Sequence, residues 1–265
     1  MWTIEQCIRE LLAVRYQLGT LHGSEEICVL LYSLIKREKP KVVVELGTGM
    51  GVSTAWMAAA MKENGFGRII TYDNGSHFDK ANVKEFLSRL YGPLEGLADK
   101  GATGTYEEFL SKLFEMVDVS SHVKYVIGDL DLSNVENVAS DLEGQKIDLL
   151  FSDYMHSAEM VQNIVGAFLP LMADTSSIFI DSASTHVPSF LTLERLVQLL
   201  NLGKIPQRMG RQQSDAQRAA TRDLLSTSSF KLMHLVEKLD RPQNSTAWIR
   251  IEPYDMVPAV TTFFH

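Results

Sequence analysis

Five mainly apolar runs in this 265-residue chain are each followed, directly or after one residue, by an acidic residue. These residues are Glu45, Asp73, Asp129, Asp153 and Asp181. A carboxylate accepts hydrogen bonds from two hydroxyls at once, attracts cationic groups and coordinates hard divalent cations. Apolar runs are typical of buried parallel strands, and open α/β sheets bind ligands outside the carboxyl ends of their strands. The pattern therefore predicts an α/β protein with a ligand site at strand ends.

The first run leads into the sequence VVVELGTGMGVST, residues 42–54, which has glycine at every second position. Glycine lets the backbone turn sharply and leaves no Cβ between the backbone and a ligand. Ser53 and Thr54 can satisfy free amides where a helix over 55–62 begins. A strand, a glycine loop and a helix in this order are typical of a nucleotide-type cofactor site, and a plain tight turn is the alternative. The glycines are Gly47, Gly49 and Gly51.

The spacing of the glycines distinguishes between cofactors. A dinucleotide site uses G-x-G-x-x-G, but here the third glycine comes one residue early, and Glu45 lies two residues before the first. A carboxylate there suits a cationic ligand better than a pyrophosphate. The E-x-G-x-G-x-G pattern resembles the first motif of class I S-adenosylmethionine-dependent methyltransferases. This resemblance implies that Glu45 and the loop, including Thr48 and Ser53, hold the methionyl part of S-adenosylmethionine (SAM).

The next two acidic residues extend the predicted cofactor site. Asp73, followed by Asn74, ends a strand about 20 residues beyond the glycines, where a carboxylate typically holds a ribose diol. An Asp-Asn-Gly turn that closes the strand is the alternative. The resemblance to methyltransferases implies that Asp129 lies near the adenine amine and that the backbone amide of Leu130 reaches a ring nitrogen.

The fourth acidic residue marks the expected reaction centre. Asp153 ends a strand that is expected beside the first one, and the residues Tyr-Met-His-Ser follow it as a helix opens. The end of this strand would face the transferable methyl group, so Asp153 and His156 are the candidate catalytic residues. A histidine titrates near neutrality and can take a proton from an attacking hydroxyl. A solvent-facing histidine is the alternative, and His186 is a weaker second candidate.

The fifth acidic residue introduces a candidate metal site. The D-x-x-H-S sequence at 153–157, together with 179–184, resembles metal-assisted small-molecule O-methyltransferases. The resemblance is closest to the branch with cephalosporin-hydroxylase-like and sugar O-methyltransferases. It implies a divalent cation such as Mg²⁺ on Asp153, Asp181 and Ser182. That branch usually has a second acidic or amide ligand where this chain has Ser182, and helix caps and turns are the alternative role of the aspartates.

The order of the remaining elements predicts the fold class. Two strands near the C-terminus enclose a turn at 240–245, and an antiparallel hairpin after five α/β units matches class I methyltransferases. The expected fold is a Rossmann-like, seven-stranded, mostly parallel sheet with helices on both faces, whereas a dinucleotide fold would continue with parallel units. Beyond the first strand, strands are expected over 67–74, 122–130, 146–153, 177–184, 230–239 and 247–252.

Helical segments account for the rest of the chain. Residues 1–40 predict an N-terminal helical cap, a kind of segment that in methyltransferase-like folds covers the cofactor site or pairs subunits, so a homodimer is one expected assembly. The methyltransferase domain would span 41–265, with insertions at about 78–121 and 186–229. The first insertion predicts two helices separated by a break near 92–104. The second contains a helix and a locally basic stretch, 203–223, that forms a lid or merely solvates a surface.

Composition excludes several classes of protein. A net charge of −8 and a pI near 5.4 argue against a nucleic-acid binder. Cys7 and Cys28 are too few for a disulfide framework or a zinc site, which favours reduced thiols. The N-terminus does not resemble a signal peptide, and no run of about 18 uncharged apolar residues occurs, so we expect a cytoplasmic protein without membrane partners.

These observations predict a SAM-dependent methyltransferase that acts on a small molecule. The absence of an Asn/Asp-Pro-Pro-Tyr sequence after the fourth strand argues against nucleobase amines, and a hydroxyl is the expected acceptor. Nitrogen and carbon acceptors stay open. One alternative is a methyltransferase-like protein that binds the cofactor without chemistry, as a regulatory or scaffold subunit. An NAD-linked oxidoreductase is the other, and the glycine spacing and the terminal hairpin disfavour it.

Overall fold

The computed structural model describes residues 4–19, 25–183, 187–236 and 245–254. These residues form two compact units. Among the described residues, the first unit holds those up to Leu130 together with Phe151–Tyr154, and the second holds the remainder. Strand β4 (Ile147–Ser152) begins in the second unit and ends in the first. His186 and most of the predicted turn at 240–245 lie outside the described residues.

The first unit is built on a parallel sheet. β1 (Val42–Leu46) pairs with β2 (Arg68–Asp73), which pairs with β3 (Val123–Ile127). The Asp153 amide donates to the Leu46 carbonyl at 2.9 Å, which joins the end of β4 to β1. Every residue of β1 is buried, as expected of a strand with a neighbour on each side and helices over the sheet. The register sets Glu45 beside Thr71.

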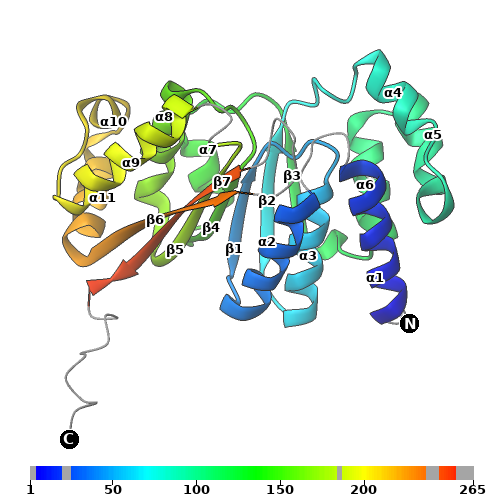
Figure 1. The fold of residues 1–265 in the computed structure, drawn as a ribbon, viewed down its shortest axis with the longest axis horizontal. Helices are drawn as coiled ribbons and strands as arrows, with labels where there is room; N and C mark the ends of the chain where they lie inside the picture. Colours follow the sequence, from blue (N-terminus) through cyan, green and yellow to red (C-terminus); the bar gives the residue numbers. More distant parts are fainter. Residues whose placement is uncertain (1–3, 20–24, 184–186, 237–244, 255–265) are drawn as a thin grey trace, which may run out of the picture. The chain divides into compact units, whose positions relative to one another are not determined.

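Two N-terminal helices belong to the same unit as this sheet (Figure 1). They are α1 (Ile4–Ala13) and α2 (Glu25–Glu38), with the π-helical turn η1 (Val14–Leu18) between them. They cover α3 (Val52–Asn64), whose first ten residues are all buried. The Trp56 indole donates to the Leu11 carbonyl at 3.1 Å, and the Asn64 amide donates to the Ile35 carbonyl at 2.8 Å. The residues predicted as an N-terminal cap therefore pack on the helix that follows the glycine loop.

The first predicted insertion is helical throughout most of its length. It contains α4 (Ala81–Leu87), the 3₁₀ turn η3 (Gly92–Leu94), α5 (Glu95–Thr103), α6 (Tyr106–Met116) and the 3₁₀ turn η4 (Ser120–His122). The predicted break near 92–104 is wrong, because α5 occupies most of it. Gly101 lets α5 pack closely on α4, because a Cβ at this position would lie 2.5 Å from the Leu87 Cβ. Tertiary packing thus overrides weak helix propensity.

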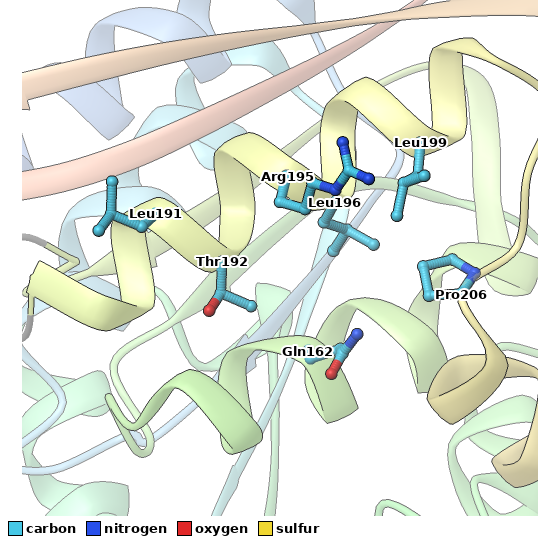
Figure 2. A pocket seen from close by; sticks show the side chains of 7 residues that line it. All are labelled: Gln162, Leu191, Thr192, Arg195, Leu196, Leu199 and Pro206. Atoms are coloured by element: carbon cyan, nitrogen blue, oxygen red, sulfur yellow. The ribbon is translucent and has the colours of Figure 1, made fainter.

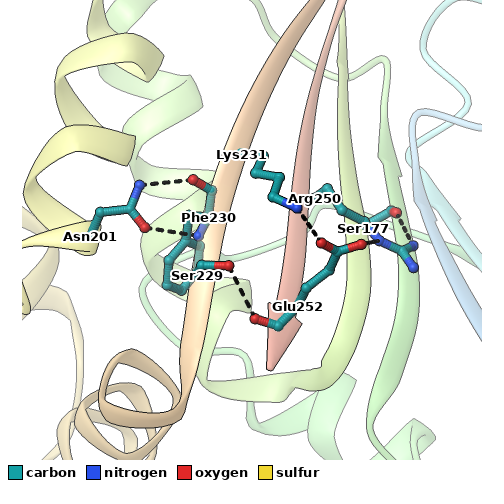
Figure 3. Close-up of polar contacts among 7 residues, drawn as sticks. All are labelled: Ser177, Asn201, Ser229, Phe230, Lys231, Arg250 and Glu252. Atoms are coloured by element: carbon teal, nitrogen blue, oxygen red, sulfur yellow. Dashed lines mark hydrogen bonds and ion pairs between the residues drawn. The ribbon is translucent and has the colours of Figure 1, made fainter. Parts of the chain in front are cut away.

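The second unit contains the antiparallel strands. β5 (Met172–Asp181) pairs with β7 (Ser245–Pro253), and β7 pairs with β6 (Ser228–Val236). The rings of Phe179 and Trp248 stack at 5.1 Å between centroids across the first pair. Asn201 bonds both the N–H and the C=O of Phe230, each at 2.8 Å, and thereby satisfies backbone groups of the edge strand β6 (Figure 3). A second polar group in that view joins Arg250 of β7 to Ser177 and Glu252.

Helices of the second unit include those of the second predicted insertion. They are α7 (Glu136–Asp141), α8 (Ala158–Phe168), the 3₁₀ turn η5 (Leu169–Leu171), α9 (Val187–Asn201), α10 (Gln207–Gln212) and α11 (Asp215–Thr227). The basic stretch at 203–223 is largely helical, and two of its arginines bond to neighbours: Arg208 pairs with Glu159 of α8, and Arg218 donates to the Gly210 carbonyl at 2.6 Å.

The strand order is β3-β2-β1-β4-β5-β7-β6, in one seven-stranded sheet. The strands β1 to β3 are parallel, and the last two strands of the chain form an antiparallel pair. This confirms the predicted α/β fold with a C-terminal hairpin. No helix among the described ranges is long and apolar enough to cross a membrane.

Candidate functional site

The glycine loop after β1 has a backbone that side chains rarely adopt. Gly47, Gly49 and Gly51 have φ values of 90°, 53° and 74°. A Cβ on Gly47 would lie 2.4 Å from the Asp153 carbonyl oxygen, and one on Gly51 would lie 2.9 Å from Leu113 of α6. Two of the three predicted glycines are therefore required by close packing within the first unit as well as by φ.

Glu45 lies beneath this loop with no exposed surface. Its carboxylate accepts from Ser53 at 2.5 Å, from Thr54, and from Thr71 at 2.6 Å. Thr71 also contacts Thr48 of the loop, with 2.6 Å between the two hydroxyl oxygens. Burial raises the pKa of Glu45 to about 7, and the Ser53, Thr54 and Thr71 bonds oppose that rise. The carboxylate thus joins β1, β2 and the start of α3.

Asp73 and Asn74 connect the ends of β2 and β3. The Asp73 carboxylate accepts from the Gly49 amide at 2.9 Å and from the Gly75 amide at 2.7 Å. Asn74 donates to the carboxylate of Asp129 at 2.8 Å. The turn expected as the alternative role of Asp73 is therefore formed. Each Asp73 oxygen receives one N–H, so each keeps a lone pair for a further donor.

Exposure separates the predicted cofactor residues into two layers. Thr48, Ser53 and Glu45 are buried. The residues open to solvent, at least in part, are Asp73, Asn74, Asp129, Leu130 and Asp153. The open set lies at the carboxyl ends of the strands of the first unit, and the buried set lies under the glycine loop. This arrangement is consistent with a ligand seated over strand ends.

Two tyrosines of the first unit that were not predicted as site residues contact this site. The Tyr106 hydroxyl donates to the Gly49 carbonyl at 2.7 Å. The side chain of Tyr154 lies near Asp129 and Asp73, and its pKa is raised by partial burial and by these two charges. Tyr154 directly follows Asp153 and so had a sequence signal. Tyr106 had none beyond its place at the start of a predicted helix.

His156 belongs to the second unit, where β5 and α9 position it. Its Nδ1 lies 3.1 Å from the Asp181 backbone carbonyl, and Ser189 of α9 donates to the His156 carbonyl. A carbonyl oxygen only accepts, so Nδ1 carries the hydrogen of this bond. In the neutral ring the lone pair then resides on Nε2. The backbone of β5 thus selects the tautomer in which Nε2 is basic.

Asp181 is held by hydroxyls on both carboxylate oxygens. Thr246 of β7 donates to Oδ1 at 2.9 Å, and Ser182 donates to Oδ2 at 3.0 Å. Only 7% of Asp181 is exposed, and burial raises its pKa, although the bonds from Thr246 and Ser182 and the charge of His156 oppose the rise. Ser182 has a φ of 54°, an uncommon value for a residue with a side chain.

Two of the predicted metal ligands bond to neighbouring groups. Ser182 donates to one oxygen of Asp181, and Thr246 donates to the other. Within the ranges that the structure describes, no group of three or more His, Cys, Asp or Glu residues could hold a metal ion. Asp153 belongs to the first unit, and Asp181 and Ser182 belong to the second. The metal site remains a prediction that these contacts do not support.

A pocket of about 230 Å³ lies between α8 and α9 in the second unit (Figure 2). None of the predicted site residues lines it. Leucines of α9 and Pro206 supply an apolar wall, and Gln162, Thr192 and Arg195 supply polar groups. It is distinct from the glycine loop of the first unit.

The family of the chain follows from comparison with known sequences. The model of a methyltransferase-domain family matches residues 44–183, which is more than half of the chain, so the chain belongs to this family. The match begins within β1 and ends just after Ser182, and it therefore includes the glycine loop and the other predicted site residues. No curated protein sequence matches the chain.

Solved structures confirm the fold. The O-methyltransferase TomG from Streptomyces achromogenes, involved in tomaymycin synthesis and crystallised with SAM, has a TM-score of 0.50 at 14% identity, covering 95% of this chain and 91% of that one. An O-methyltransferase from Bacillus cereus in complex with SAH has a TM-score of 0.52 at 14% identity, with coverages of 93% and 90%. A methyltransferase from Geobacter sulfurreducens has a TM-score of 0.50 at 15% identity, with coverages of 91% and 89%. The predicted resemblance to class I methyltransferases is thereby confirmed.

Proposed function

We propose that this methyltransferase uses SAM to methylate a hydroxyl group of a small molecule. The observation that carries the proposal is the glycine loop, whose Gly49 amide is bonded to Asp73 at the end of the next strand. This geometry joins the two parts of the predicted cofactor site within one compact unit. The O-methyltransferases among the similar structures support the choice of a hydroxyl acceptor.

The residues of the first unit suit SAM in hydrogen-bonding capacity. The site offers the carboxylates of Asp73 and Asp129, which Asn74 connects. The remaining lone pairs of Asp73 would accept from the ribose hydroxyls. Asp129 and the amide of Leu130 would hold the adenine, and the loop around Gly49 would hold the methionyl part. The buried Glu45 would support the loop from below.

The acceptor side would rest on Asp153 and His156. Bound SAM supplies an electrophilic methyl group, and the protein must align the acceptor oxygen and remove its proton. The tautomer fixed by the Asp181 carbonyl leaves Nε2 of His156 as the basic nitrogen. His156 would take the acceptor proton on that nitrogen, and Asp153 would orient the acceptor. No step of this proposal uses a metal, because His156 provides the base.

Calorimetric titration with S-adenosylhomocysteine (SAH), the demethylated product, tests the cofactor. Wild-type protein should bind SAH and not NADH. Asp73→Ala should weaken SAH binding at least about tenfold, because a charged acceptor of hydroxyl donors is removed. Asp79→Ala is the matched control: Asp79 is largely exposed on the same segment after β2, 3.7 Å from Lys84, and its loss should leave SAH binding unchanged.

The same titration, together with a turnover assay on a panel of acceptors, distinguishes this proposal from the alternative functions. Binding of NADH in place of SAH, or binding of neither, would contradict the proposal. Tight SAH binding without turnover of any hydroxyl, amine or carbon acceptor in a broad panel would favour a protein that binds the cofactor without chemistry. Turnover of amine acceptors alone would keep the methyltransferase and reject the hydroxyl.

A further inference from the structure

Gly49 is held through both of its backbone polar groups by side chains of other elements. Its amide donates to Asp73 of β2 at 2.9 Å, and its carbonyl accepts from Tyr106 of α6 at 2.7 Å. Tyr106 lies 57 positions along the chain and belongs to the helical insertion. With φ at 53° and no side chain of its own, Gly49 relies on these two bonds for its orientation.

The ring of Tyr106 also contacts the loop after β2. A Cβ on Gly75 would lie 2.8 Å from the ring, and the ring of Phe78 lies 5.4 Å away between centroids. Tyr106 therefore bridges the loops that follow β1 and β2, which are the two loops of the proposed cofactor site. Only 7% of its surface is exposed.

The capping and packing of helix α6 fix the position of Tyr106. Thr105 and Glu108 form a capping box at the start of the helix, so the position of its first residue is well defined. Leu110, Leu113 and Phe114 lie within 3.3 Å of where a Gly51 Cβ would be, so the same helix packs against the far end of the glycine loop. Burial and the charges of Asp73 and Glu45 raise the pKa of Tyr106, which keeps its hydroxyl a neutral donor.

We propose that Tyr106 is a positioning residue for the cofactor, because its hydroxyl fixes the Gly49 carbonyl while Asp73 fixes the Gly49 amide. This inference rests on the proposed use of SAM. Tyr106 acts through the loop and touches no reacting atom. This role means that the helical insertion contributes to cofactor affinity. Loss of the Tyr106 hydroxyl should therefore weaken the binding of the cofactor and leave the binding of the acceptor unchanged.

The experiment compares two tyrosine-to-phenylalanine variants. Tyr106→Phe keeps the ring and removes the bond to Gly49. Tyr125→Phe is the matched control. Tyr125 of β3 packs against Phe114 of the same helix at 6.1 Å between ring centroids, whereas the Gly49 carbonyl accepts from Tyr106. Calorimetry should give about fivefold to tenfold weaker SAH binding for Tyr106→Phe, the effect of one buried hydrogen bond, and wild-type affinity for Tyr125→Phe.

Kinetics and a second variant distinguish positioning from general destabilisation. For Tyr106→Phe, KM for SAM should rise while KM for the acceptor stays unchanged. Phe78→Leu keeps the Tyr106 hydroxyl but removes the ring that packs on Tyr106 at 5.4 Å between centroids. It should weaken SAH binding in the same direction, which also covers the case in which Tyr106→Phe does not fold.

Each outcome has one meaning. If the wild-type protein does not bind SAH, the proposed function fails, and this inference fails with it. If the wild-type protein binds SAH and both tyrosine variants bind it equally well, only the role of Tyr106 is overturned. Equal losses of affinity in Tyr106→Phe and Tyr125→Phe would also overturn it, since a general loosening of α6 would then be sufficient.

Discussion

The glycine-loop region of the first unit and the His156 region of the second unit are held in different ways. In the first, side chains from β1, β2, α3 and α6 bond to the loop or to one another beneath it. In the second, His156 is held through the backbone carbonyl of Asp181 and by a bond from Ser189. The contacts described for the glycine loop thus come from side chains of several elements, whereas those described for His156 involve backbone carbonyls.

Gly47→Ala should have the largest effect on the cofactor side. A Cβ would meet the Asp153 carbonyl oxygen at 2.4 Å, and φ is 90°, so overlap adds to backbone strain. We expect a loss of about 4 kcal/mol in the free energy of unfolding, measured by urea denaturation, and loss of SAH binding.

Gly65→Ala is the control for Gly47→Ala. Its φ is 80°, close to that of Gly47, but no atom lies within 4 Å of an added Cβ. Backbone strain alone should cost about 1 kcal/mol and leave SAH binding intact. Equal losses for the two variants would show that contact with the end of β4 contributes nothing.

His156→Ala tests the acceptor side. Removal of the proposed base should lower turnover about 100-fold, and SAH affinity should not change, because the proposed cofactor site is built from Asp73, Asp129 and the loop around Gly49. His234→Ala is the matched control: His234 stacks on Phe190 of α9 at 4.1 Å, in the same unit, and its loss should leave turnover near wild type.

A chelator adds a second arm to the His156 experiment. Wild-type activity should persist in EDTA, because the proposed proton transfer uses a histidine. Activity that disappears in EDTA and returns with Mg²⁺ would restore the metal site predicted at Asp153, Asp181 and Ser182 and would contradict the role given to His156.

The contrast between the two regions also explains what the sequence could predict. The fold and the glycine loop follow from local patterns: apolar runs, glycine spacing and carboxylates at strand ends. The direction of the Glu45 side chain does not, because it depends on Thr71 in the neighbouring strand and on Ser53 and Thr54 in the next helix. A motif identifies the residue, whereas tertiary contacts decide whether it faces a ligand or the core.

The insertion shows the same limit more clearly. Helix α5 was not predicted, because glycine lowers helix propensity. The packing of Gly101 against Leu87 shows why glycine is favourable at this position. The bond between Tyr106 and Gly49 joins residues 57 positions apart, and no periodicity encodes such a contact. The hydroxyls around Asp181 were likewise beyond prediction, since Thr246 reaches it only through the pairing of β5 with β7.

The effect of Glu45→Gln should depend on pH. The pKa of Glu45 is raised by burial from 4.5 to about 7, so the folded protein takes up a proton that the unfolded chain releases between these values. Stability from this group is therefore complete below pH 4.5 and is lost as the pH rises toward 7. The charge of Asp73 raises the pKa of Glu45 further, and the charge of Glu45 raises the pKa of Tyr106.

The measurement is the free energy of unfolding of wild type minus that of Glu45→Gln, followed from pH 4.5 to pH 8. We expect the difference to fall by at most about 3 kcal/mol, since glutamine cannot lose a proton. Glu108→Gln is a control of opposite sign, because bonds from Lys100 and Thr105 lower the pKa of Glu108, so its stabilising contribution is lost as the pH falls. A pH-independent difference for Glu45→Gln would mean that its three hydroxyl donors outweigh burial and keep the carboxylate ionised beneath the loop.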